Sequence, residues 1–391
     1  MLFKIICLTF LKRSILKIAV PKETKFKENR VALSPEGVKE LSAKGFSCII
    51  ETGAGLKSYF TDEAYTTAGA TLVNDKTELY SQADVVLKVN PPLPEEAALM
   101  KKDSVLMSFM FAATNPELVE VCVKNHITSF SVDAIPRISK AQKMDALSSQ
   151  ANLAGYKSVI LAANELGKIF PLLMTAAGTI KPAKVLIMGA GVAGLQAIAT
   201  AKRLGAIVEV SDIRPETKEQ VQSLGGKFIE VAGDNSVKME GGYVKGVSED
   251  FLKKQQELIA KHAAAADIII TTALIPGKKA PVLITEEMVK SMKLGSVILD
   301  MAVENGGNCV LSELNQTVVK HGVTIVGESN LPSLLPLNAS ELYSKNICTF
   351  LIHLATKEGF KWEMEEEITK GSLITHKGAV LHPSVKKEVL A

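Results

Sequence analysis

A short glycine-rich stretch constrains the fold of this chain more than any other feature. Residues 189–194 read Gly-Ala-Gly-Val-Ala-Gly, a G-x-G-x-x-G pattern. The apolar run 184–188 predicts a buried strand before it, residues 193–204 predict a helix after it, and residues 207–211 predict the next strand. Asp212 closes that second strand, 21 positions after the middle glycine. This order of elements is that of a dinucleotide-binding βαβ unit.

Each part of the pattern has a physical role in holding a dinucleotide. Gly189 permits a tight turn, Gly191 lets a pyrophosphate approach the backbone, and Gly194 lets the helix pack closely on the strand. The helix N-terminus offers free N–H groups and a partial positive charge to the phosphates. The Asp212 carboxylate can bind ribose hydroxyls and would repel a 2′-phosphate, which favours NAD, although Arg214 weakens this preference. The alternatives are a glycine-rich turn without a ligand and an FAD site.

The length and composition of the chain favour an ordinary globular protein with two domains. Its 391 residues are too many for one typical core. A net charge of +3 gives no electrostatic argument for a nucleic-acid partner. The five cysteines include no C-x-x-C pair, and the six histidines show no metal-ligand spacing. We therefore expect reduced cysteines in a cytosolic protein, and no bound metal.

Strand and helix patterns alternate in two series along the chain, which indicates parallel sheets. The first series runs from residue 17 to 131 and the second from 184 to 326. Long helical patterns at 147–167 and 339–355 follow the two series. We expect an α/β protein with two Rossmann-like, doubly wound parallel-sheet domains, a cleft between them, and long connector helices that join them.

The same patterns predict the domain boundaries. An N-terminal Rossmann-like domain would comprise residues 17–136 plus 357–391, and a dinucleotide-binding domain with the connector helices would comprise 137–356. Residues 1–16 are too short to span a membrane and lack a signal-peptide pattern, so we expect a disordered leader or a wrongly assigned start. Residues 232–250 are rich in Gly, Asp, Asn and Ser, which predicts a long loop with a functional or mobile role.

A second candidate site follows the first series of strands. Residues 137–150 read RISKAQKMDALSSQ and concentrate polar groups. Arg137 could pair with a phosphate or carboxylate, and Gln142 offers both a donor and an acceptor. Asp145 could pair with Arg137 or cap the following helix. From composition alone, a solvated loop with a helix cap is the simpler interpretation.

Residues 137–156 resemble the signature of the proton-translocating NAD(P) transhydrogenases. The segment matches the NAD(H)-binding component, domain I, which forms the first section of the alpha subunit. The resemblance extends from about Lys17 nearly to the C-terminus. Further matching segments are 18–30, 178–179, 189–205, 212–226, 271–280 and 308–309. The family implies two α/β domains, with NAD(H) bound on the second.

The resemblance also assigns roles to individual residues. It implies that the catalytic, nicotinamide-proximal residues are Arg137, Gln142, Asp145 and Ser148. It implies cofactor contacts at Ile138, Ser139, Gly189, Ala190, Gly191, Val192, Gly194, Asp212, Ile213, Arg214, Gly242, Tyr243, Gln255 and Leu274. Of these, 190–192 match pyrophosphate contacts and 212–214 match ribose contacts. Gly242 and Tyr243 match the tip of a mobile loop. Gln255 and Leu274 match adenosine-side and ribose-side contacts.

The family further implies an activity and a set of partners. Hydride would pass between NAD(H) on this chain and NADP(H) on a partner subunit, coupled to proton movement across a membrane. The sequence shows no pattern typical of membrane helices. We therefore expect a membrane-embedded proton-channel subunit and an NADP(H)-binding beta subunit as separate chains. The resemblance implies a homodimer of this chain, cytoplasmic and peripheral on the inner membrane through those partners.

Two other functions compete with this interpretation. Alanine dehydrogenase is related in fold, but its deamination chemistry moves protons and needs an acid/base residue. The histidine of that family would fall near Phe109, where this chain has no histidine. Lys88 matches its substrate lysine, although transhydrogenases keep a lysine there too. The second alternative is a non-catalytic NAD-binding regulatory module, which the match at 137–148 disfavours.

Overall fold

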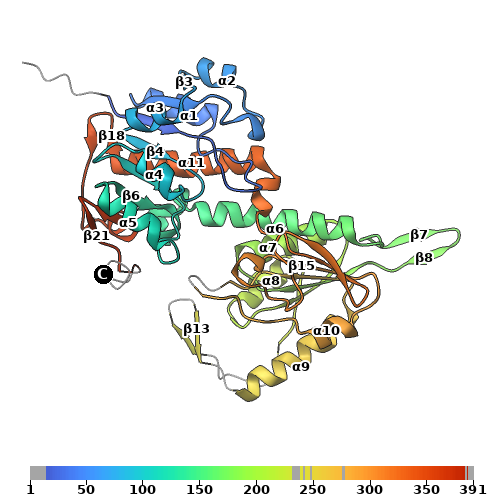
Figure 1. Ribbon diagram of the computed structural model, residues 1–391. Coiled ribbons are helices and arrows are strands. Elements are labelled where there is room, and N and C mark those ends of the chain that lie inside the picture. Colours follow the sequence, from blue (N-terminus) through green and yellow to red (C-terminus); the bar gives the residue numbers. More distant parts are fainter. Residues whose placement is uncertain are drawn as a thin grey trace, which may run out of the picture. The chain divides into compact units, whose positions relative to one another are not determined.

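The computed structural model describes residues 15–230, 238–240, 243–246, 249–274, 278–383 and 385 (Figure 1). Contacts within the chain divide it into two compact units. The first comprises the described residues up to Leu147 together with those from Pro336 onward, and the second comprises Ser148–Leu335. The expected leader, residues 1–16, lies outside the described region except for Ile15 and Leu16.

The first unit is built on a sheet in the order β21-β20-β6-β5-β4-β1-β2-β3. Its strands are β1 (Lys17–Val20), β2 (Ser47–Glu51), β3 (Thr71–Val73), β4 (Val85–Leu87), β5 (Val105–Ser108), β6 (Thr128–Ser131), β20 (Leu373–His376) and β21 (Ala379–Val380). β1 to β6 are parallel and follow the doubly wound order 3-2-1-4-5-6. β20 pairs antiparallel with β6, so the C-terminal segment completes this sheet.

The helices of the first unit begin at the signals that the sequence carries. They are α1 (Pro35–Ala43), α2 (Asp62–Thr67), α3 (Lys76–Gln82), α4 (Pro94–Ala98), α5 (Pro116–Lys124), α11 (Pro336–Leu354) and α12 (Glu367–Ser372). At α1, the Ser34 hydroxyl accepts a hydrogen bond from the Gly37 N–H at 3.2 Å, and Pro35 occupies the first turn. The short strands β18 (Ala355–Thr356) and β19 (Gly359–Phe360) form a hairpin after α11.

The two compact units meet at 147/148 and 335/336, whereas the sequence predicted domain boundaries at 136/137 and 356/357. The reason lies in the core of the first unit. Tyr343, Ile347 and Phe350 of α11 are fully buried in the same cluster as strands β1, β2 and β4. Met144 joins that cluster from the segment before α6 (Ala146–Glu165). The residues on either side of the second series therefore pack with the first sheet.

The second unit repeats the same topology. Its sheet has the order β11-β10-β9-β14-β15-β17-β16. The strands are β9 (Lys184–Met188), β10 (Ile207–Ser211), β11 (Lys227–Phe228), β14 (Ile268–Thr271), β15 (Val297–Asp300), β16 (Thr317–Lys320) and β17 (Val323–Val326). All pair in parallel except β16, which lies antiparallel beside β17. Its helices are α6, α7 (Val192–Arg203), α8 (Thr217–Ser223), α9 (Glu249–Ala265) and α10 (Glu286–Ser291).

These two sheets confirm the expected α/β fold with two Rossmann-like, doubly wound sheets. At the edges of these sheets the strands β16, β20 and β21 run antiparallel, a detail that the sequence patterns did not predict. β16 and β17, like β20 and β21, are joined by tight turns, and a hairpin return needs no crossover helix.

Two hairpins of the second unit lie in stretches that the sequence did not predict as strands. β7 (Leu173–Thr175) pairs antiparallel with β8 (Gly178–Ile180), and every residue of both strands is exposed. Figure 1 shows this hairpin extending away from the sheet of its unit. Within the predicted loop 232–250, β12 (Lys238–Glu240) pairs antiparallel with β13 (Tyr243–Gly246).

The described cysteines agree with the expectation of reduced cysteines. The cysteines of the described residues, Cys48, Cys122, Cys309 and Cys348, are buried and free, and Cys7 lies outside these residues. In the described region of the chain, no helix is both long enough and apolar enough to cross a membrane.

Candidate functional site

The glycine-rich turn lies at the carboxyl end of β9, where the strand order of the second sheet reverses. Gly189 has a φ of +110°, which glycine adopts freely and other residues rarely do. A Cβ on Gly189 would lie 2.3 Å from Oγ1 of Thr272, which follows β14. The Thr272 hydroxyl donates to the Gly189 carbonyl at 3.2 Å. The turn is therefore fitted against the neighbouring strand β14, at the position where doubly wound folds bind nucleotides.

The other two glycines differ in what surrounds them. A Cβ on Gly194 would lie 1.9 Å from the Gly189 carbonyl oxygen, so only glycine allows α7 to pack so closely. A Cβ on Gly191 would meet no atom within 4 Å. Gly191 is also the N-cap of α7, and no side chain caps that helix start. Space beside Gly191 and the uncapped N–H groups of α7 fit a pyrophosphate.

Asp212 is brought directly to this turn. Its Oδ2 accepts a hydrogen bond from the Ala190 N–H at 2.6 Å. Arg214 forms a two-point pair with the same carboxylate, Nε to Oδ1 at 3.0 Å and a terminal nitrogen to Oδ2 at 2.8 Å. In this structure the Arg214 guanidinium is thus directed at Asp212. The charge that weakened the sequence argument for NAD is neutralised within the site itself.

The remaining predicted contacts of the second unit lie on several different elements of the chain. Val192, Ile213 and Leu274 are exposed. Gln255 is half-buried on α9, one turn before Ile259, which packs in the core with β9 residues. Gly242 lies outside the described residues. Tyr243 is the first residue of β13, and its side chain is outside the described region.

The second predicted group follows β6 in the first unit. Ser139–Met144 form the 3-10 helix η3, and Asp145 separates it from α6. Arg137, Ser139 and Gln142 are exposed, whereas Ile138, Asp145 and Ser148 are half-buried. The buried Asn346 side chain on α11 donates to the Lys143 carbonyl at 2.9 Å. Residues 137–147 belong to the first unit, whereas Ser148 belongs to the second.

The structure also reveals a buried charge cluster, of which only Lys88 was singled out from the sequence. It lies at the carboxyl ends of β1 and β4, the point of strand reversal in the first sheet. Arg30 pairs with Glu28 at 2.7 Å, and both are buried. Lys88, 1% exposed, lies 3.4 Å from a Glu23 oxygen and 3.5 Å from a Glu96 oxygen. The sequence feature that could have revealed this cluster is the high density of charged residues at 22–30, directly after a predicted strand.

The Glu28 carboxyl makes this cluster sensitive to acid. Burial opposes its charge, but Arg30 and hydrogen bonds from Arg30 and Asn90 outweigh burial and lower its pKa to about 2. Because the folded pKa lies below the ordinary value of 4.5, ionised Glu28 stabilises the fold above pH 4.5, and this contribution is lost as the pH falls towards 2.

We expect the first unit to lose about 3 kcal/mol from this group between pH 4.5 and 2. The single tryptophan, Trp362, lies in the first unit, so its fluorescence during urea unfolding at each pH follows this loss. Glu28→Gln is the matched variant, and its stability should change less with pH in that window. Equal slopes for the two proteins would contradict the assignment.

The position where a histidine would favour alanine dehydrogenase is apolar in the structure. Phe109 is 6% exposed. Its ring stacks on Phe111 with centroids 5.8 Å apart and lies 5.4 Å from the Tyr343 ring. Phe109 therefore offers no proton donor.

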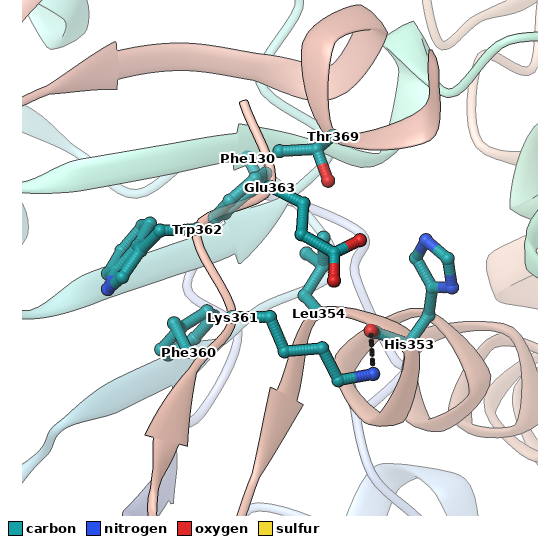
Figure 2. A pocket seen from close by; sticks show the side chains of 8 residues that line it. All are labelled: Phe130, His353, Leu354, Phe360, Lys361, Trp362, Glu363 and Thr369. Carbon is teal, nitrogen blue, oxygen red and sulfur yellow. Dashed lines mark hydrogen bonds between the residues drawn. The ribbon is translucent and has the colours of Figure 1, made fainter. Parts of the chain in front are cut away.

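A small hollow in the first unit is too small for a substrate. Figure 2 shows Phe130, Trp362, Glu363 and Thr369 around it, with Lys361 Nζ donating to the His353 carbonyl at 2.8 Å. Its volume of about 10 Å³ accommodates one water molecule. Among the described residues, no group of three or more His, Cys, Asp or Glu is placed to hold a metal ion.

Comparison with known proteins gives consistent matches along the chain. The alanine dehydrogenase/PNT N-terminal domain matches residues 19–154, and the alanine dehydrogenase/PNT C-terminal domain matches residues 158–383. A protein of Rhodospirillum rubrum, named as the first section of NAD(P) transhydrogenase subunit alpha, is 52% identical over 379 residues, which cover 95% of this chain and 99% of that protein.

Solved structures agree with the sequence matches. The crystal structure of a transhydrogenase from Sinorhizobium meliloti matches with a TM-score of 0.86 and 44% identity, covering 93% of this chain and 99% of that one. An L-alanine dehydrogenase matches with a TM-score of 0.80 and 30% identity, covering 96% and 99%. The chain therefore belongs to the alanine dehydrogenase/PNT family, and within these comparisons it is more similar to the NAD(P) transhydrogenase alpha subunits than to alanine dehydrogenase.

Proposed function

We propose that this chain is the NAD(H)-binding subunit of a proton-translocating transhydrogenase. It binds NAD(H) at the glycine turn of the second unit and exchanges hydride with NADP(H) held by a partner subunit. The observation that carries this proposal is the geometry at β9. Open space beside Gly191, the uncapped start of α7 and the adjacent Asp212 carboxylate together suit a pyrophosphate and a ribose.

The proposed reaction makes few chemical demands on the protein. Bound NADH supplies the hydride, and the exchange between two nicotinamides needs no general acid or base. The protein must hold the two rings with their reacting carbons about 3–3.5 Å apart. Arg137, Gln142, Asp145 and Ser148 supply charge and hydrogen bonds without a histidine, which is consistent with positioning. We infer that Gln142 orients the ribose and nicotinamide between the two cofactors.

Gln142→Asn tests this role, because it shortens the exposed side chain by one methylene and keeps the amide. Hydride transfer should slow at least about tenfold, since misplacement by roughly 1 Å removes much of the gain from orientation. The affinity for NADH should change less than about twofold. Stopped-flow rates and equilibrium dialysis measure the two quantities, and an equal loss in both would sink the role of Gln142.

Asp212 is proposed to select NAD(H) over NADP(H). Asp212→Asn removes the carboxylate that pairs with the Arg214 guanidinium at 2.8 Å and that would repel a 2′-phosphate. We expect the ratio of the NADPH and NADH dissociation constants to fall about tenfold or more, as expected for a charge-assisted hydrogen bond. Arg214→Met is the control, because it removes the ion pair but keeps the carboxylate, and should still reject NADPH. An unchanged ratio in Asp212→Asn would count against this selectivity role.

The proposal includes partners. The chain would act as a homodimer docked on a membrane-embedded proton-channel subunit, with an NADP(H)-binding beta subunit supplying the second nicotinamide. It would therefore lie on the cytoplasmic side of the inner membrane. The names of the relatives, which describe alpha subunits, support an assembly of several chains.

The deciding experiment mixes this chain with an NADP(H)-binding component and follows NADH-dependent reduction of an NADP analogue. Reduction that needs both proteins supports the proposal. NADH binding without any hydride transfer would instead indicate a regulatory module.

An alanine dehydrogenase activity is the second candidate, and two observations weigh against it. Phe109 carries no proton donor. The ammonium of Lys88 is already engaged by two carboxylates of the chain, Glu23 and Glu96. NADH oxidation that depends on pyruvate and ammonia would reverse this conclusion.

A further inference from the structure

A buried amide side chain lies at the edge of the second sheet where β14 ends. Asn308 is 0% exposed. Its Oδ1 accepts from the Ala273 N–H at 3.1 Å, and its Nδ2 donates to the carbonyls of Ala273 at 3.0 Å and Pro281 at 2.8 Å. The Asn308 side chain therefore bonds both the N–H and the carbonyl of Ala273, as the backbone of a neighbouring strand would do. The amide thereby holds the chain after β14 in a single path.

The held segment lies directly beside the glycine turn. Thr272, the residue before Ala273, contacts the Gly189 carbonyl through its hydroxyl. Its backbone N–H also donates to the Met188 carbonyl at 2.9 Å. Leu274, the residue after Ala273, is 47% exposed. Asn308 therefore fixes the backbone between a residue that contacts the turn and a side chain that faces outward.

A second buried group fixes Asn308 itself. Asp300, at the end of β15, is 0% exposed. Its Oδ2 accepts from the Cys309 N–H at 2.9 Å and from the Ser312 hydroxyl at 2.7 Å. Its Oδ1 accepts from the Thr271 hydroxyl at 3.0 Å. The Asp300 carboxylate therefore binds both the loop that carries Asn308 and the last residue of β14. These two sets of hydrogen bonds fix the distance between Asn308 and Ala273.

The topology indicates which half of a dinucleotide this segment faces. In a doubly wound sheet the dinucleotide crosses the point of strand reversal, here between β9 and β14. Asp212, at the end of β10, marks the ribose of the adenosine half. The other half, with the nicotinamide, then lies towards β14. Because this step uses the NAD(H) site, it rests on the proposed function.

We propose that Asn308 is a positioning residue of the NAD(H) site, which holds residues 272–274 in the shape that receives the nicotinamide half. The test uses two variants of the full chain. Asn308→Asp replaces the Nδ2 donor with an oxygen that faces two carbonyls. Asn308→Ser removes the amide without adding a charge. It therefore allows the measurement even if the buried carboxylate of Asn308→Asp prevents folding. Ile325→Ala, a core truncation in β17, serves as the control for lost stability.

Dissociation constants for NADH and for 5′-AMP, measured by calorimetry, separate the two halves of the ligand. Both Asn308 variants should bind NADH about tenfold more weakly, as expected for lost hydrogen bonds, and bind AMP within about twofold of the unchanged chain. Ile325→Ala should leave both constants near their starting values at temperatures where it is folded.

The outcomes distinguish the two proposals. If the Asn308 variants bind NADH normally, or lose AMP and NADH binding equally, the positioning role is overturned while the proposed function stands. If the unchanged chain binds neither ligand, the NAD(H) site itself is wrong.

Discussion

Replacing Gly191 with alanine is expected to weaken NADH binding about 100-fold, which corresponds to roughly 2.7 kcal/mol, and to leave the fold intact. A Cβ at this position points into open space, so the free chain can accept the methyl group without moving an atom. The same space is where the pyrophosphate would approach the backbone. The substitution therefore separates binding from folding, which few changes in a glycine turn can do. Calorimetric titration with NADH and a thermal melt measure the two effects.

Two comparison variants make this result decisive. Gly167→Ala adds a methyl group where no atom lies within 4 Å and should change neither measurement. The next residue, Lys168, pairs with Asp267 at the start of β14, whereas the glycine turn lies at the carboxyl ends of the strands. Gly194→Ala should lower both affinity and melting temperature, because its Cβ would overlap the Gly189 carbonyl oxygen. If Gly191→Ala binds NADH as well as the unchanged chain does, the ligand does not approach this turn and the proposed site is wrong.

Arg30→Met is expected to lower the free energy of unfolding of the first unit by about 3–5 kcal/mol. The guanidinium is 7% exposed and donates to both oxygens of Glu28, at 2.8 and 2.7 Å. Methionine fills a similar volume but removes the guanidinium that pairs with the buried Glu28 carboxylate at 2.7 Å. Urea unfolding followed by Trp362 fluorescence reports on this unit.

The control for Arg30 is an ion pair whose cation is half-exposed although its carboxylate is buried. Lys22 lies 3.7 Å from Glu51, and its side chain is 49% exposed. Lys22→Met should cost less than about 1 kcal/mol, because water screens the half-exposed ammonium and Glu51 keeps the hydrogen bond from the backbone N–H of residue 22. The double variant Glu28→Gln, Arg30→Met should recover some of the stability, since no buried charge is left unpaired. A loss for Arg30→Met no larger than that for Lys22→Met would refute the burial argument.

The alternating strands and helices were predictable because each carries a local signal. Buried parallel strands are continuous apolar runs, as at Lys184–Met188. Helices such as Pro35–Ala43 begin with a capping side chain followed by a proline, and both are visible in the sequence. The hairpin Leu173–Ile180 carries no such signal. Both its strands are exposed on every residue, so there is no alternation between a buried and a solvated face. The antiparallel edge strand β20 was missed as a strand for a different reason, because its partner β6 lies far away in the sequence.

The candidate site divides in the same way. The glycine turn and Asp212 were predictable because their spacing along one βαβ unit carries the chemistry. The hydrogen bond between Asn308 and Ala273 joins residues that are 35 positions apart. The contacts that Arg30 and Asn90 together make with Glu28 depend on two strands that lie side by side. No periodicity encodes such contacts. The pairing of Arg214 with Asp212 was not predictable either, because closeness along the chain does not fix where a guanidinium points.

The antiparallel strand β20 has a consequence for biosynthesis. Its position beside β6 means that this edge of the sheet begun by Lys17–Val20 is covered only when Leu373–His376 have been made. At roughly 5–20 residues per second, translation from Ser131 to Leu373 lasts about 10–50 s. Throughout that interval β6 is an open edge with unpaired backbone groups, whereas the contiguous Ser148–Leu335 unit can finish folding. The sheet whose strands are synthesised first is therefore the last to reach its native state, and β6 is where a nascent chain is most exposed to wrong pairing.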